Sequence, residues 1–136
     1  MKRGIAVRWI RDAAVFGGVL VTVLASAAAP AEASANVGWL YTINGGGAIF
    51  FDADLNGQPG IEKITVCDNK SDGRGVWGEV QEQWGGDLIA VDDPSNNGKC
   101  ASWSGNYFTE EQGVVVRVWE YAGTWKSTEV WELGVA

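Results

Sequence analysis

The chain of 136 residues contains no histidine. Its absence excludes Ser-His-Asp and Cys-His catalytic mechanisms and the usual zinc sites. Carboxylates remain, and glycoside hydrolysis uses two of them at a defined separation. Because 17 Asp and Glu residues make some pair inevitable, their presence does not indicate a hydrolase. The composition therefore predicts a protein without enzymatic activity, with a carboxylate-based hydrolase as the catalytic alternative.

Basic residues are also scarce, with 10 Lys and Arg against the 17 acidic residues and a formal net charge of −7. Binding to nucleic acid depends on clustered Lys and Arg that neutralise phosphates. A surface with this charge repels a polyanion. Nucleic acid is therefore excluded as a partner.

Only two cysteines occur, Cys67 and Cys100. Two lone cysteines 33 positions apart do not form the spaced clusters of a metal site. In an exported protein such a pair indicates one disulfide. Closing a loop of this size stabilises a fold by roughly 3–4 kcal/mol in the chain-entropy model. We therefore predict a Cys67–Cys100 disulfide.

The N-terminal segment has the organisation of a secretory signal peptide. Four basic residues within the first 12 positions precede an apolar run at 13–29, and small residues then define cleavage before Ser34 or Asn36. A membrane anchor is the alternative, but about 17 diluted apolar residues are short for a bilayer. We predict a signal peptide at 1–35 and a secreted, extracellular domain at 36–136 with no membrane contact after cleavage. Cleavage leaves 6 basic and 15 acidic residues of the original 10 and 17, a net charge of about −9.

Short β-branched and aromatic runs follow the leader, separated by Gly, Asn, Asp and Ser, and no segment after residue 36 has helical periodicity. The runs fall at residues 37–43, 48–54, 61–69, 75–84, 87–91, 114–121 and 125–133. About seven short strands in roughly a hundred residues predict a single all-β domain. The expected fold is a small antiparallel β-sandwich, or a partly open barrel, with one disulfide.

The last two runs predict a hairpin. A three-residue loop at 122–124 sets Tyr121 against Trp125, Glu120 against Lys126 and Arg117 against Glu129, and both charge pairs are then opposite in sign. One face of this hairpin collects the valines, Val114, Val116, Val118 and Val130, and is the expected core face. The other face collects Val115, Arg117, Trp119, Tyr121, Trp125, Trp131 and Leu133. A slip of two residues would preserve both faces.

The stretch DADLNGQPGIE, residues 52–62, begins like a calcium loop, with oxygen-bearing side chains two apart and then a glycine. An EF-hand loop needs a bidentate Glu at position 12, but that position is Lys63 and a strand-like segment follows. An EF-hand is therefore rejected. The favoured interpretation is a polar turn, and no cofactor is expected. A looser calcium site remains the alternative, with the candidate ligands Asp52, Asp54, Asn56 and Glu62.

Residues 65–76, TVCDNKSDGRGV, form a strand that ends in a cysteine, a turn and a returning strand. Asp68, Asp72 and Gly73 are the expected turn residues, with the aspartates bonded to the backbone. This segment, followed by Cys100, Glu111, Gly113 and VVVRV, resembles a group of small secreted actinomycete proteins of uncharacterised function. The resemblance implies no particular activity. Such proteins often have a second cysteine pair near the C-terminus, at about the positions of Trp119 and Trp131, so local packing is expected to differ here.

Tryptophan is unusually frequent, with eight in the chain, and of these only Trp9 lies in the leader. Seven are difficult to bury in so small a core, so we expect at least two to be exposed. The candidates for ligand binding are Trp119, Tyr121, Trp125 and Trp131. Exposed aromatic rings stack on sugars and anchor protein interfaces. The alternative is that they fill the core.

These features favour an extracellular binding module that contacts a polysaccharide, the cell wall or a protein through an aromatic face. The alternative is an inhibitor of a secreted hydrolase that presents an exposed segment such as residues 102–113 to the enzyme.

Overall fold

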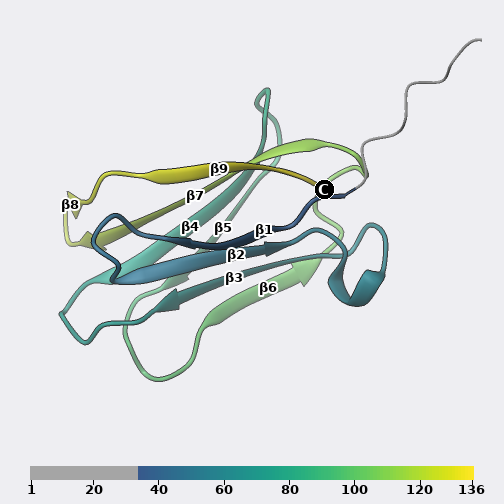
Figure 1. Ribbon diagram of the computed structural model, residues 1–136. Helices are drawn as coiled ribbons and strands as arrows, with labels where there is room; N and C mark the ends of the chain where they lie inside the picture. Colours follow the sequence, from purple (N-terminus) through teal and green to yellow (C-terminus); the bar gives the residue numbers. More distant parts are fainter. Residues whose placement is uncertain (1–33) are drawn as a thin grey trace, which may run out of the picture.

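The computed structural model describes residues 34–136, so the predicted leader lies outside the described residues except for its last two positions. The described chain forms two antiparallel sheets that pack face to face as a β-sandwich (Figure 1). One sheet has the strand order β1 (Val37–Tyr41), β2 (Gly47–Asp52), β3 (Glu62–Asp68) and β6 (Ala101–Gly105). The other contains β5 (Leu88–Asp93), β4 (Gly75–Glu82), β7 (Gly113–Ala122), β8 (Trp125–Lys126) and β9 (Val130–Val135). A 3₁₀ turn, η1 (Leu55–Gly57), follows β2.

The all-β prediction is confirmed, and within residues 34–136 there are nine strands where the sequence predicted about seven. The difference has two sources. Strand β6, ASWSG, lacks β-branched residues and is formed by its pairing with β3. The last predicted run is divided into β8 and β9, which both pair with β7.

The core lies between the sheets and consists of side chains that alternate along the strands. Val114, Val116 and Val118 of β7 are fully buried, as predicted, and Val130 packs against them half-buried. The four-stranded sheet contributes Ile49 and other apolar side chains, namely Val37, Phe51, Ile64 and Val66. The period of two therefore identified the inner face of β7.

The predicted disulfide is present. Cys67 of β3 is bonded to Cys100, which immediately precedes β6, and their Cα atoms are 4.4 Å apart. The bond links the loop after β5 to the four-stranded sheet. No helix among residues 34–136 is long and apolar enough to cross a membrane.

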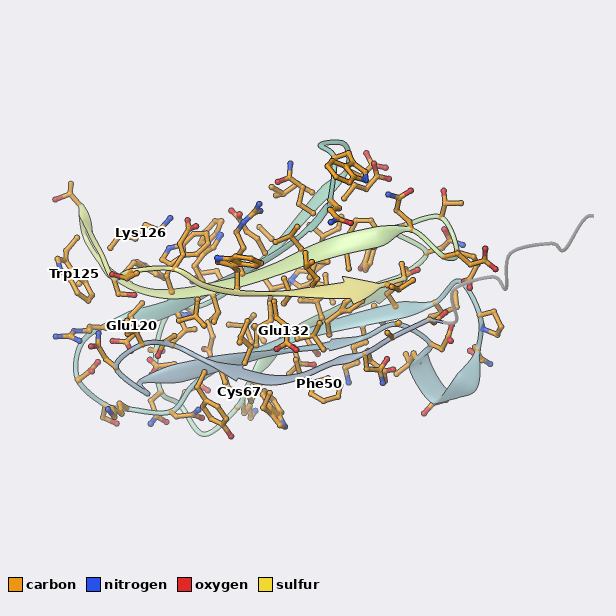
Figure 2. The ribbon with its side chains drawn as sticks, turned by 45° about the horizontal axis from the view of Figure 1, so that its top comes forward. Phe50, Cys67, Glu120, Trp125, Lys126 and Glu132 are labelled. Atoms are coloured by element: carbon orange, nitrogen blue, oxygen red, sulfur yellow. A yellow bond between two sulfur atoms is a disulfide. The ribbon has the colours of Figure 1, made fainter. Side chains whose placement is uncertain are left out.

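The buried carboxylate of Glu120 is bonded to both sheets. Glu120 of β7 is 1% exposed and accepts hydrogen bonds from Thr42 Oγ1 (2.6 Å) and Gly46 N (3.0 Å), both in the β1–β2 turn. It also pairs with Arg74 over 3.0 Å, in the loop between β3 and β4. Figure 2 shows Glu120 between the layers. We call this end of the sandwich the Glu120 end.

The approach of the turn to Glu120 requires a glycine. A Cβ at position 46 would lie 2.6 Å from Glu120 Oε1, closer than real contacts allow. Gly46 therefore lets the backbone reach the carboxylate.

Burial by itself would raise the pKa of Glu120, but the hydrogen bonds from Thr42, Arg74 and Gly46 outweigh it and hold the pKa below its ordinary value of 4.5. A carboxylate with a lowered pKa in the fold stabilises the protein above its unfolded pKa. That contribution is lost as the pH falls through the folded pKa.

We expect Glu120→Gln to lower the free energy of unfolding by about 1.5–3 kcal/mol at pH 7, because hydrogen bonds to a buried charge are lost. The difference from the wild type should shrink as the pH falls from 4.5, the ordinary pKa, through the lowered pKa of folded Glu120. Urea unfolding at several pH values measures both. A difference that stays constant between pH 7 and pH 3 would contradict this role for the charge.

Candidate functional site

The outer face of the five-stranded sheet carries aromatic side chains where solvent-facing strands usually carry polar ones. In the register of β4, β7 and β9, Trp77 lies opposite Trp119, and Arg117 lies opposite Trp131. Val115 lies opposite Leu133. Three of the four predicted ligand-binding residues, Trp119, Tyr121 and Trp131, therefore belong to this face.

Trp119 is closed off from solvent, contrary to the expectation that it is exposed. Its ring stacks on Trp77, with ring centroids 6.2 Å apart and an angle of 24° between planes. The Nζ of Lys126 lies 3.7 Å from the centroid of Trp119, and only 8% of the residue is exposed. Trp119 therefore packs within the outer layer and offers no free ring face.

Tyr121 is also held in place. Its hydroxyl donates a hydrogen bond to Asp92 Oδ1. Burial, this hydrogen bond and the nearby carboxylates raise the pKa of Tyr121 to about 12. Its ring lies over Gly75, where a Cβ would come within 2.5 Å of it. The tyrosine is therefore a fixed, half-buried part of the surface.

Trp131 is the open aromatic residue of this face, 62% exposed. It lines a groove of about 330 Å³ together with Val115, Arg117 and Glu129, and we call this the Trp131 groove. Arg117 Nη1 donates to Gln81 Oε1 over 3.1 Å, which holds its guanidinium on the sheet surface. Leu133, 51% exposed, continues the apolar surface along β9. An exposed ring beside hydrogen-bonding groups can hold a ligand with both apolar and polar sides.

The fourth candidate, Trp125, lies elsewhere because the predicted hairpin register is wrong. The structure pairs Ala122 with Trp125 and Tyr121 with Lys126, around a two-residue turn in which Gly123 has φ of 58°. This one-residue difference turns Trp125 to the side of Glu120, where it lies 4.6 Å from the Arg74 guanidinium. Figure 2 shows Trp125 at the Glu120 end, and it does not line the Trp131 groove.

The predicted charge pairs change with the register. Glu120 pairs with Arg74 instead of Lys126, and Lys126 pairs with Glu129. Beyond Lys126 the ladder is interrupted, because Ser127 Oγ accepts from Glu120 N over 3.0 Å. Strand β9 then resumes with Arg117 opposite Trp131, two residues from the predicted register, and its faces are those predicted.

A second aromatic surface, which the sequence interpretation missed, covers the outer face of the four-stranded sheet. Trp39 and Tyr41 of β1 are 47% and 56% exposed, and the Trp39 ring lies 5.4 Å from that of Phe50. Figure 2 shows Phe50 and Cys67 on this outer side. A hollow of about 190 Å³ lies between Trp39, Tyr41 and the disulfide. The i, i+2 spacing of Trp39 and Tyr41 was the available signal.

Trp84 is the most exposed large apolar residue described, at 87%. It lies at the tip of the β4–β5 hairpin, followed by Gly85 and Gly86, which both have positive φ. The predicted inhibitory segment at 102–113 is less exposed to a partner enzyme than Trp84, because its Phe108 is buried in the core.

Residues 52–62, the candidate calcium loop, form a turn between β2 and β3. Asn56, Gly57 and Gly60 adopt φ of 57°, 70° and 75°. Asp54 Oδ1 and Glu62 Oε1 are buried without a hydrogen-bond partner, while Glu62 Oε2 accepts from Tyr107 N. Asp52 lies opposite Lys63 in the register of β2 and β3. No group of three or more metal-ligating side chains comes together in residues 34–136.

The β3–β4 turn uses its aspartates as predicted. Lys70 N donates to Asp68 Oδ1 and Arg74 N donates to Asp72 Oδ1, each over 3.0 Å, and Gly73 has φ of 76°. These bonds shape the loop that carries Arg74 toward Glu120.

The chain matches no protein-family model, no curated protein and no solved structure in the comparisons made. The resemblance to secreted actinomycete proteins therefore stays a prediction, and function has to be inferred from the surfaces themselves.

Trp119 and Trp131 should differ strongly when truncated. Trp119→Ala should lower the free energy of unfolding by about 3–5 kcal/mol, because it empties a packed site. Trp131→Ala should lower it by about 0.5 kcal/mol or less, because the ring is mostly in solvent. Urea unfolding of the two variants measures the difference. Equal destabilisation would show that Trp131 is a packing residue.

Proposed function

We propose that the protein is a non-enzymatic, extracellular binding module that holds a polysaccharide in the Trp131 groove. The observation that carries the proposal is the exposure of Trp131 on a sheet face, beside the polar groups of Arg117 and Glu129. A pyranose ring has an apolar face and a rim of hydroxyl groups. The indole fits the apolar face, and the guanidinium and carboxylate can bond to the hydroxyls.

The charge of the protein narrows the class of polysaccharide. With a net charge of −7 for the whole chain, binding of an anionic polymer would be opposed by long-range repulsion. A neutral polymer such as cellulose or chitin, or the glycan of a cell wall, is therefore the ligand class that we propose.

Secretion is part of the same proposal. The sequence of residues 1–35 has the order of a signal peptide, and the disulfide between Cys67 and Cys100 is of the kind that persists in oxidising compartments. Both features agree with a ligand outside the cell.

Binding to insoluble cellulose, chitin and purified cell wall tests the function. We expect Trp131→Ala to weaken retention by about tenfold or more, as for a central aromatic contact. Trp103→Ala is a matched control, because Trp103 is 60% exposed but lies on β6 in the other sheet. Equal retention of wild type and Trp131→Ala on every polymer that is bound, or no retention at all, would contradict the proposal.

A second candidate function, inhibition of a secreted hydrolase, is favoured by Trp84 at its hairpin tip. A rigid hairpin that ends in a bare indole can fill a pocket in an enzyme, as interface anchors do. If the protein is an inhibitor, Trp84→Ala should lose inhibition of culture-medium hydrolases while Trp131→Ala retains it. If the wild type inhibits a hydrolase and Trp84→Ala inhibits it equally well, this hairpin is excluded as the inhibitory segment.

A further inference from the structure

The Glu120 end contains a cavity that the proposed polysaccharide site does not use. It has a volume of about 330 Å³ and lies between the loop after β3 and the loop after β5. Polar side chains line it, among them Asp68, Ser71, Ser95 and Asn96. The Trp131 groove lies on the outer sheet face and shares none of these residues.

Asp68 is incompletely bonded within this cavity. The residue is 7% exposed, and its Oδ1 accepts a hydrogen bond from Lys70 N over 3.0 Å. Its Oδ2 is buried and has no hydrogen-bond partner among the described residues. A buried carboxylate oxygen without a partner is costly, so a donor that enters the cavity would gain a strong acceptor.

The surroundings of Asp68 are rich in negative charge. Asp93 is 3% exposed, and its Oδ2 accepts a hydrogen bond from the backbone N–H of Asp68 over 2.7 Å. Burial, the largest cause, and the charges of Asp93 and Asp72 raise the pKa of Asp68 above its ordinary value, against the opposing effect of the backbone N–H groups of Lys70 and Asn96. A positive charge next to Asp68 would relieve this repulsion.

The two basic residues that line the cavity are engaged elsewhere. Arg74 pairs with Glu120 over 3.0 Å and lies against the ring of Trp125. Lys70 Nζ donates to the carbonyl oxygen of Asn44 over 2.8 Å. In the described chain, no cationic side chain is therefore bonded to the carboxylate of Asp68, which lines the cavity, or to its neighbours Asp72 and Asp93.

We propose that this cavity binds a primary ammonium group of a small ligand, which donates a hydrogen bond to Asp68 Oδ2. The ammonium supplies the missing donor and the missing positive charge together, and charge-assisted hydrogen bonds of this kind are strong. Ser71, Ser95 and Asn96 offer hydroxyl and amide groups to the rest of the ligand. The proposal does not depend on polysaccharide binding at Trp131.

An ammonium group can come from an amino sugar or from an alkylamine such as a lysine side chain. Calorimetry at pH 6 with matched charged and uncharged probes distinguishes these two sources. Glucosamine is compared with glucose, and n-butylamine with n-butanol. The proposal is supported if either amine binds while its uncharged analogue does not. The amine that binds then identifies the source of the ammonium group. Failure of both amines to bind, or equal binding of the uncharged analogues, would overturn it.

Asp68→Asn tests the residue, because it keeps the shape and removes the charge. We expect amine binding to weaken by at least tenfold. Asp54→Asn is the matched control, since Asp54 also has a buried oxygen without a partner but follows β2 at the opposite end of the sandwich. Equal binding by Asp68→Asn and wild type, or an equal loss in Asp54→Asn, would contradict the assignment.

NMR of the wild type keeps the test independent of whether Asp68→Asn folds. On addition of the amine, the carboxyl carbon of Asp68 and the amide signals of residues 69–74, 93, 95 and 96 should shift most. Shifts confined to other parts of the protein would place the amine elsewhere and overturn the proposal.

Discussion

The buried carboxylate of Glu120 is the interaction on which the arrangement of this protein depends. It belongs to the five-stranded sheet, yet two of its hydrogen-bond donors come from the β1–β2 turn of the other sheet. A carboxylate taken out of water is tolerated only when its oxygens are well bonded. Thr42, Gly46 and Arg74 therefore have to meet at one point, which fixes the separation of the two layers at this end (Figure 2).

The backbone of the same residue helps to explain how the aromatic residues are distributed. Because Ser127 bonds to the backbone of Glu120, the β7–β8 ladder cannot continue in one register into β9. Trp125 is directed to Arg74, while Lys126 covers Trp119. Trp131, beyond the interruption, remains open. A surface that looks like one aromatic face in the sequence is thus divided into a packed part and an exposed part.

The sequence was sufficient for those features that depend on local chemistry. Alternation identified the inner valines of β7, glycine and asparagine marked the turn after β2, and two cysteines could form a single bond. It was insufficient where tertiary contacts decide. The predicted hairpin register was supported by opposite charges on Glu120 and Lys126. In the fold, Glu120 pairs with Arg74 and Lys126 pairs with Glu129, and the sequence alone does not distinguish these partners. The cavity at Asp68 could not be predicted, because it forms only where the loop after β3 meets the loop after β5.

The most direct test of the binding account is the NMR signal of each tryptophan indole N–H during titration with soluble cello- and chito-oligosaccharides. The seven tryptophans of residues 36–136 provide seven probes, which lie on strands of both sheets and on the β4–β5 hairpin. The account predicts that the Trp131 signal moves furthest, while buried Trp119 moves little. Movement confined to Trp39 or Trp84, or no movement with any sugar, would contradict the claim that the Trp131 groove is the ligand site.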